Sequence, residues 1–186
     1  MLKIAVVVGS VRPGRKGRTV ADWVVAQSGG REGADYEIVD LADHPLPLLN
    51  EPLPPRMGRH EHEHTKRWAA AVAPYDGYVF VTPEYNHGMP ASLKNALDYL
   101  YAEWVDKATA IVGYGYLGAG RSVEQLRSVL SSLQMAHVSP ALHFSLIHDW
   151  HNQGADFRPG EHHYGAAVQM FDQVEAWAGA LKTLRG

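Results

Sequence analysis

Cysteine is absent from this sequence. Disulfide bonds, cysteine-ligated zinc, iron–sulfur clusters and thiol catalysis are therefore excluded. A chain without thiols fits a reducing compartment, and we expect a cytoplasmic protein. Long apolar runs are also missing. The run near the amino terminus covers only residues 4–8, which is too short for a signal peptide or for the roughly 20 residues that span a bilayer. We expect no association with membranes.

A strong excess of one charge is missing as well. The formal net charge is −3 at pH 7, and charged residues make up 20% of the 186 residues. Broad nucleic-acid binding needs a basic face, so we expect no nucleic-acid partner. Hydrophobic residues make up 46% of the chain, which is enough for a substantial core, and the length is typical of one domain. We therefore expect residues 1–186 to form a single domain.

Short β-branched runs alternate with helix-like stretches along the chain. Five such alternations predict a parallel sheet covered by helices on both faces, which is a three-layer α/β sandwich. The natural strand order is 2-1-3-4-5 with right-handed crossovers. The strands are expected at residues 3–9, 36–41, 77–82, 108–114 and 138–146. The helices are expected at residues 18–28, 61–73, 90–101, 120–135 and 165–184.

Ligands of such sheets bind beyond the carboxyl ends of the strands, so the loops after strands 1, 3 and 4 are the candidate site. The first loop, residues 9–19, reads GSVRPGRKGRT. It enters a helix, whose free N–H groups favour anions. Ser10 and Thr19 add hydroxyl groups, Arg12 adds a guanidinium, and further basic residues raise the local potential: Arg15, Lys16 and Arg18. The loop matches neither the dinucleotide fingerprint nor the Walker motif, yet its charge and position predict phosphate binding.

The other two loops combine rigid, aromatic and glycine residues. Residues 83–90 read PEYNHGMP, and residues 114–121 read YGYLGAGR. Prolines and glycines of this kind let backbone groups approach a flat ring closely. Each loop alone is equally consistent with an ordinary turn, and His87 alone is better explained as a surface residue. Together the three loops predict a site for a mononucleotide with a long ring system.

Three segments of the chain resemble one known family. They are GSVRPGRKGRTVADW, PEYNHGMPASLKNALDYLYAEW and YGYLGAGRSVEQLR, and they resemble the NADPH-dependent FMN reductases, which include bacterial quinone, chromate and azo-dye reductases. The similarity runs over residues 3–143. It implies a flavodoxin-like fold that holds FMN without a covalent bond, with NADPH or NADH as electron donor. It also implies a homodimer or homotetramer.

The resemblance further implies which residues contact FMN. The phosphate would be held by Ser10, Arg12, Gly17, Arg18 and Thr19. The isoalloxazine ring would be lined by Pro83, Glu84, Tyr85, Asn86 and His87, with its pyrimidine side bordered by Tyr114, Gly115 and Gly118.

The implied reaction is ping-pong hydride transfer. NAD(P)H would reduce the flavin and leave, and a flavin, quinone or related small acceptor would then take the electrons at the same place. No side chain is an obligatory acid or base in this scheme, although His87 is a candidate proton donor. The alternatives are a flavodoxin-type electron carrier without its own nicotinamide site, which the modest charge disfavours, and a phosphate-binding domain without flavin.

Several further features are left with two interpretations. The proline-rich residues 42–60 are expected to form an ordered loop, which is either a rim over the ring or a simple connection. His60 and His64 have a spacing that suits a metal, but a solvated helix start is the better interpretation, and we predict no metal site. His162 and His163 are expected to be exposed, and Trp150 and Phe157 are expected to pack against a partner subunit.

Overall fold

The five expected strands form one parallel sheet in the order β2-β1-β3-β4-β5. This computed structural model describes residues 1–185. The strands are β1 (Leu2–Val8), β2 (Ala34–Asp40), β3 (Gly77–Pro83), β4 (Ala108–Gly115) and β5 (Ala136–Ser145). Their bounds and order confirm the predicted flavodoxin-like topology within a few residues. β1 and β3 are buried along nearly their whole length, as expected of strands covered on both faces.

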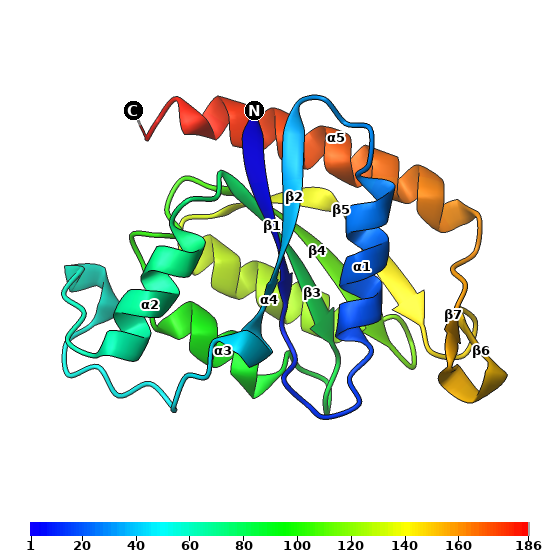
Figure 1. Cartoon of the computed structure of the whole chain (residues 1–186), viewed down its shortest axis with the longest axis horizontal. Coiled ribbons are helices and arrows are strands. Elements are labelled where there is room, and N and C mark those ends of the chain that lie inside the picture. The colour runs from blue at the N-terminus through cyan, green and yellow to red at the C-terminus, as the bar shows by residue number, and fades with distance from the viewer. Residues whose placement is uncertain (186) are drawn as a thin grey trace.

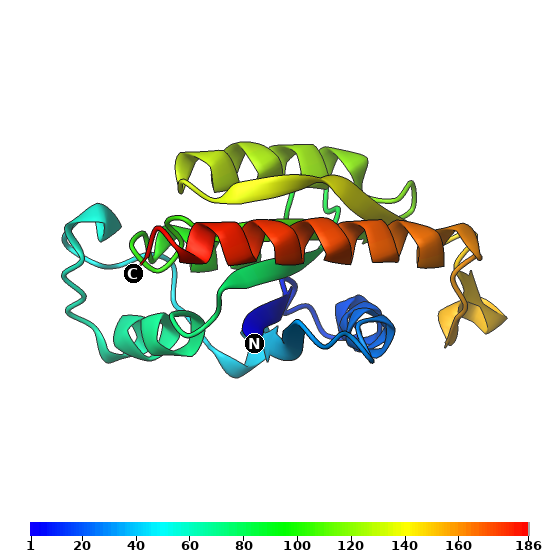
Figure 2. The ribbon, with the colours of Figure 1, turned by 90° about the horizontal axis from the view of Figure 1, so that it is seen from above.

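Helices cover both faces of the sheet. The helices are α1 (Gly17–Gln27), α2 (Glu63–Val72), α3 (Ala91–Asp98), α4 (Gly120–Ser132) and α5 (His162–Lys182). One hydrophobic cluster joins α1 and α5 to one face, and a second joins α2, α3 and α4 to the other. Figure 2 shows α5 running lengthwise along the molecule, and it shares its face of the sheet with α1. Among residues 1–185, none of the helices has the length and apolarity needed to cross a bilayer.

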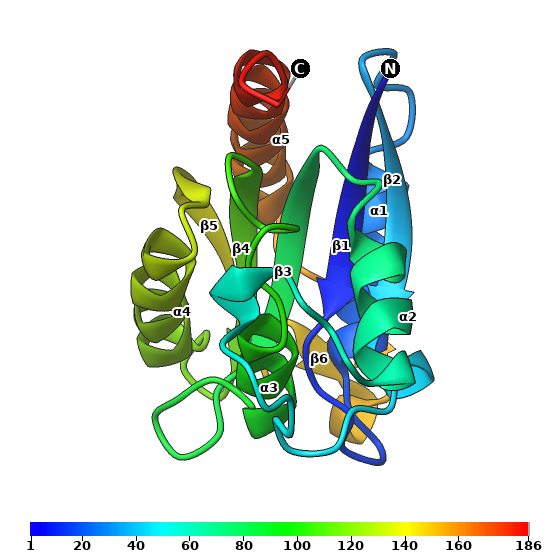
Figure 3. The same ribbon diagram turned by 90° about the vertical axis from the view of Figure 1, so that its left-hand side faces the viewer.

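The register of the strands brings their carboxyl ends to one edge. Val8 pairs with Asp40 on one side and with Val81 on the other, and Gly115 pairs with Ser145. The loops that leave these ends therefore gather at the lower edge in Figure 1 and Figure 3, opposite the amino terminus. The chain crosses from β1 toward β2 in one direction and from β3 toward β4 in the other, so this edge contains the switch point where such folds bind ligands.

A small hairpin between β5 and α5 was not predicted. β6 (Trp150–His151) and β7 (Asp156–Phe157) are antiparallel strands of two residues each. They flank a short 3₁₀ helix at Asn152–Gly154, and the hairpin projects beyond the start of α5 (Figure 2). Strands this short leave no readable alternation in a sequence, which explains why the pattern did not reveal them.

Candidate functional site

The loop between β1 and α1 is tied to the loop after β3. Ser10 is buried, and its hydroxyl lies 2.8 Å from the hydroxyl of Tyr85. The same Ser10 oxygen accepts a hydrogen bond from the backbone N–H of Arg12 at 3.3 Å. α1 begins after Lys16 without any side chain capping its first N–H groups. These groups are left to bind a ligand or water, which favours an anion at this end of α1.

Three basic side chains of this loop have different neighbours. The Arg12 guanidinium lies 5.9 Å from the centre of the Tyr85 ring. Arg15 forms a 2.6 Å ion pair with the buried Asp40 at the end of β2. Arg18 turns along α1 to Asp22, and its side chain is 54% exposed. The expected set therefore divides: Arg12 faces the second loop, whereas Arg18 does not.

The loop after β3 closes on itself through a tight turn. Tyr85 and Gly88 exchange two backbone hydrogen bonds, of 2.9 and 3.1 Å. Asn86 and His87 between them both have positive φ, at 50° and 68°, as in a type I′ turn. Asparagine and histidine are both enriched among the non-glycine residues that adopt this conformation. The turn leaves both side chains exposed at the sheet edge.

Glu84 connects the second loop to the third. Its carboxylate accepts hydrogen bonds from the backbone N–H groups of Arg121 and Ser122, at 3.0 and 3.4 Å. It also accepts one from the Arg121 guanidinium at 2.8 Å. Burial alone would raise the pKa of Glu84, but these donors outweigh it and leave the pKa below its ordinary value. Since Ala119 provides no side-chain cap for α4, Glu84 supplies that cap from another loop.

The third loop contributes a buried tyrosine and a closely packed glycine turn. Tyr114 is 4% exposed, and burial raises the pKa of its hydroxyl well above the ordinary range. That hydroxyl lies so close to Gly17 that a Cβ there would come within 2.9 Å of it. The Gly118 carbonyl accepts a hydrogen bond of 2.8 Å from His143. Tyr116 and Leu117, in contrast, are largely exposed.

A cavity of about 390 Å³ lies where the three loops meet. Six of the expected site residues line it: Arg12, Pro83, Glu84, Tyr85, Tyr114 and Gly115. Asn86 and His87 line an adjoining cavity beside Tyr116 and Leu117. Ser10 and Gly17 do not line the first cavity, but each contacts a residue that does: Ser10 contacts Tyr85, and Gly17 contacts Tyr114. Thr19 is exposed on α1, and neither it nor Arg18 or Gly118 belongs to the lining of either cavity.

Other lining residues were not among the expected FMN contacts. Arg15 and Lys16 line the same cavity as Arg12, and the basic cluster was the signal that pointed to them. Leu146, which follows β5, also lines it. Nothing in the pattern around Leu146 marked it, because its place depends on the register of β5 against β4.

The residues around this cavity fit FMN. Among residues 1–185, the buried Nε of Arg15 and the buried hydroxyl of Tyr114 have no hydrogen-bond partner. Both are donors, and both belong to residues that line the cavity. Arg12 and Lys16 also line the cavity, and with the start of α1 they supply positive charge suited to a phosphate. Pro83, Glu84 and Gly115, from the ends of β3 and β4 and the loop after β3, also line the cavity, which suits a flat ring.

The connection from β5 to α5 corrects two expectations. His163 was expected to be exposed, but it is buried, with only 5% of its surface exposed. Its Nε2 lies 3.2 Å from the buried Asp149 carboxylate. Burial lowers the pKa of His163 despite that carboxylate. Trp150 is also buried within its own chain and packs on Phe157, with ring centroids 4.4 Å apart. The hairpin brings these aromatic side chains together, so they do not need a partner subunit to cover them.

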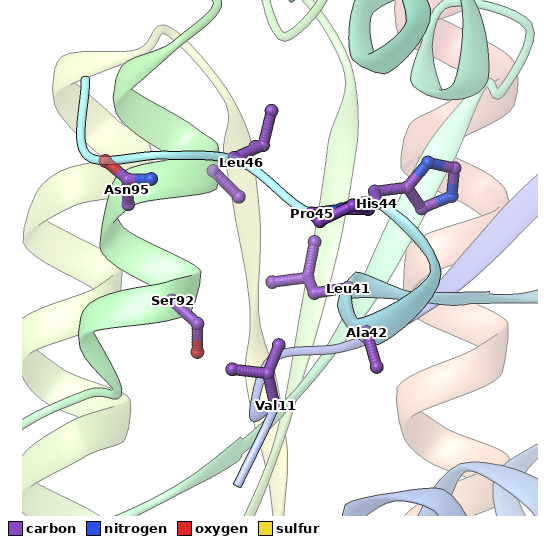
Figure 4. A pocket seen from close by; sticks show the side chains of 9 residues that line it. Val11, Leu41, Ala42, His44, Pro45, Leu46, Ser92 and Asn95 are labelled. Atoms are coloured by element: carbon purple, nitrogen blue, oxygen red, sulfur yellow. The ribbon is translucent and has the colours of Figure 1, made fainter. Parts of the chain in front are cut away.

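The proline-rich loop is ordered, as predicted, and it packs on α3. Asn95 donates to the Pro47 carbonyl at 2.7 Å and accepts from the Leu49 N–H at 2.9 Å. The loop encloses a separate cavity of about 340 Å³ with Val11 and Ser92 (Figure 4). His60 bonds to Glu103 and His64 to Asn50, so the two histidines do not share a partner. The loop thus borders the site region through Val11 while remaining anchored as a connection.

Comparison with known proteins agrees with this geometry. The family described as NADPH-dependent FMN reductase matches residues 2–149. An NAD(P)H-dependent FMN reductase of Schizosaccharomyces pombe is 50% identical over 145 residues, covering 75% of this chain and 72% of that protein. A quinone reductase of Pseudomonas putida is 35% identical over 136 residues, covering 66% of this chain and 67% of that protein.

Solved structures agree with the fold. A flavoenzyme NAD(P)H:(acceptor) oxidoreductase from Paracoccus denitrificans superposes with a TM-score of 0.74 at 21% identity, covering 97% of this chain and 98% of that one. The family match and the identity to the fission-yeast protein confirm the resemblance seen in the three loop segments. This chain belongs to the NADPH-dependent FMN reductase family.

Proposed function

We propose that this chain binds FMN in the cavity between the three loops and uses NADPH or NADH to reduce quinones or related small acceptors. The observation that carries the proposal is the lining of that cavity. It combines the basic Arg12 and Lys16, beside the start of α1, with Pro83, Tyr85 and Gly115 from the ends of β3 and β4 and the loop after β3. A mononucleotide with a phosphate and a flat ring matches this combination.

The side chains act by binding and orienting rather than by acid–base chemistry. FMN supplies the two-electron chemistry when it is bound. Arg12 neutralises the phosphate, and Ser10 holds the loop in place through Tyr85. Glu84 fixes the loops after β3 and β4 relative to each other. The adjoining cavity beside His87 and Tyr116 gives the donor and acceptor room to approach the ring.

The names of relatives support the class of acceptor. Besides the Pseudomonas protein, a 2-hydroxy-1,4-benzoquinone reductase of Burkholderia is 33% identical over 141 residues. A steady-state assay of NADPH and NADH oxidation by the FMN-loaded protein, with menadione as acceptor, tests the proposal. We expect turnover that depends on both menadione and FMN. A flavodoxin-type carrier would retain FMN but show no turnover with either nicotinamide.

We also propose that the protein forms a homodimer or homotetramer. Large apolar side chains are exposed in the single chain, including Leu48 at 82% and Leu117, which lines the cavity beside His87, at 73%. Exposed groups of this kind are common at interfaces between subunits. Light scattering on the FMN-loaded protein measures the mass, and a monomer at micromolar concentration would contradict the proposal. The cytoplasmic location stays a prediction that cell fractionation can test.

A further inference from the structure

The β6–β7 hairpin touches the phosphate loop through one lysine. The Lys16 ammonium donates a hydrogen bond to the Gly154 carbonyl, far along the chain. It also lies 5.6 Å from the centre of the Trp150 ring, within the range of a cation–π contact. Lys16 directly precedes the first residue of α1. The hairpin therefore fixes a cation beside the start of α1, in the lining of the cavity.

Glycine at position 154 is what allows this approach. Its φ is 86°, a conformation that favours glycine. A Cβ at this position would lie 2.9 Å from the Lys16 ammonium nitrogen. A side chain there would require the ammonium to shift from its present position.

The hairpin is itself rigidly mounted. Asp149, which is 3% exposed, accepts hydrogen bonds from the Ser145 N–H at 2.7 Å and from the Gly160 N–H at 3.2 Å. Its backbone carbonyl accepts another from the Arg158 N–H at 2.8 Å. Trp150 is held between Phe157 and Tyr114, with ring centroids 4.4 and 6.4 Å away. These contacts attach the base of the hairpin to the end of β5 and to Tyr114 of β4.

A held ammonium retains binding capacity. Lysine has three N–H donors, and the Gly154 carbonyl uses one of them. Lys16 lines the same cavity as Arg12 and Arg15. Fixing its long side chain in advance removes part of the entropy that binding would otherwise cost. A fixed cation of this kind increases affinity for a phosphate group.

We propose that Lys16 binds the phosphate of FMN and that the β6–β7 hairpin, through the Gly154 carbonyl and Trp150, is the positioning element that holds it there. The inference rests on the proposed function, since it names a residue of the same site and the segment that orients it. The match to the FMN reductase family ends at residue 149. The hairpin therefore lies beyond the segment that matches the family, and it acts on the site through its contacts to Lys16.

The test is a double-mutant cycle read with two flavins. Lys16→Met removes the cation, and Gly154→Asn adds a Cβ while keeping a residue that tolerates positive φ. Dissociation constants of FMN and of riboflavin, which lacks the phosphate, are measured by quenching of flavin fluorescence. We expect Lys16→Met to raise the dissociation constant of FMN about tenfold or more, as for loss of a hydrogen bond to a charged group. The dissociation constant of riboflavin should change less than about twofold. Gly154→Asn should raise the dissociation constant of FMN about threefold or more when Lys16 is present. In the Lys16→Met protein it should have no further effect on that constant.

Lys94→Met is the matched control. Lys94 is an exposed lysine paired with Asp98 on α3, so its loss should leave both affinities unchanged. Phosphorus NMR of bound FMN is a second readout, in which Lys16→Met and Gly154→Asn should shift the resonance alike. Additive effects of the two substitutions, or equal weakening of FMN and riboflavin, would overturn the inference. If the unaltered protein binds neither flavin, the proposed function itself fails.

Discussion

Arg12 and Arg18 belong to one basic loop, but the structure gives them different surroundings. Arg12 lies over the Tyr85 ring at the cavity, and Arg18 pairs with Asp22 on the exposed side of α1. Sequence reasoning assigned both to the phosphate, because position in a loop shows which charges are near but not where each side chain points. The direction depends on partners contributed by other elements, such as Tyr85.

This difference between the two arginines gives a direct prediction. Arg12→Ala should weaken FMN binding about tenfold or more, since it removes a charge-assisted contact to the phosphate. The fold should remain intact because the Arg12 side chain is exposed. Arg18→Ala is the matched variant and should change the dissociation constant less than about twofold, as expected for an exposed ion pair. Flavin fluorescence titration measures both. An Arg12→Ala protein with unchanged affinity would remove Arg12 from the site.

At the scale of elements, α4 depends on the loop after β3. Ala119, which precedes the helix, has positive φ and no side-chain cap. Glu84 supplies the missing acceptors from a loop that is distant in sequence. Since a Glu that follows a strand has no local sign of a capping role, the sequence identified Glu84 only as a ring-lining residue. Its structural role became visible only once the two loops were side by side.

Glu84→Gln should therefore destabilise the protein by about 1 kcal/mol at neutral pH, since it weakens a helix cap and an ion pair. The pKa of Glu84 is lowered in the folded protein, so its contribution is complete above the unfolded value of about 4.3. It is lost as the pH falls through the lower folded value. Urea denaturation at pH 7 and below pH 4 measures the difference between the two proteins.

The contrasting control is Glu63→Gln. Glu63 forms an ion pair with Lys66 on the surface of α2, and its side chain is 74% exposed. Its loss should cost less than about 0.5 kcal/mol. A Glu84→Gln protein as stable as the unaltered one at pH 7, or a difference that does not shrink in acid, would contradict the capping role.

At the scale of the whole molecule, the fold was predictable because one physical pattern repeats. Each buried run such as residues 77–82 is followed by a helix with an apolar face, and only a parallel sheet covered on both sides accommodates five such units. The hairpin of Trp150 and Phe157 was not predictable in this way. It is stabilised by aromatic packing and by the buried Asp149, which are contacts between residues of no regular spacing.

The site, like the fold, was predictable only in part. The three loops were identified because parallel strands place their carboxyl ends together. Lys16 was counted as a basic residue, but its partners were not predicted, because Gly154 belongs to the irregular segment before α5. Sequence patterns therefore located the cavity, and tertiary contacts decided which of its charged side chains are fixed in place.

The visible absorption spectrum tests the central claim most directly. The purified protein is mixed with FMN, desalted, and titrated with NADPH and then NADH in the absence of oxygen. The account predicts that flavin absorption stays with the protein and bleaches on addition of at least one of the two nicotinamides. Two results would contradict it. One is flavin that is lost on desalting together with no binding in a titration to high FMN concentration. The other is bound flavin that stays unbleached with both donors.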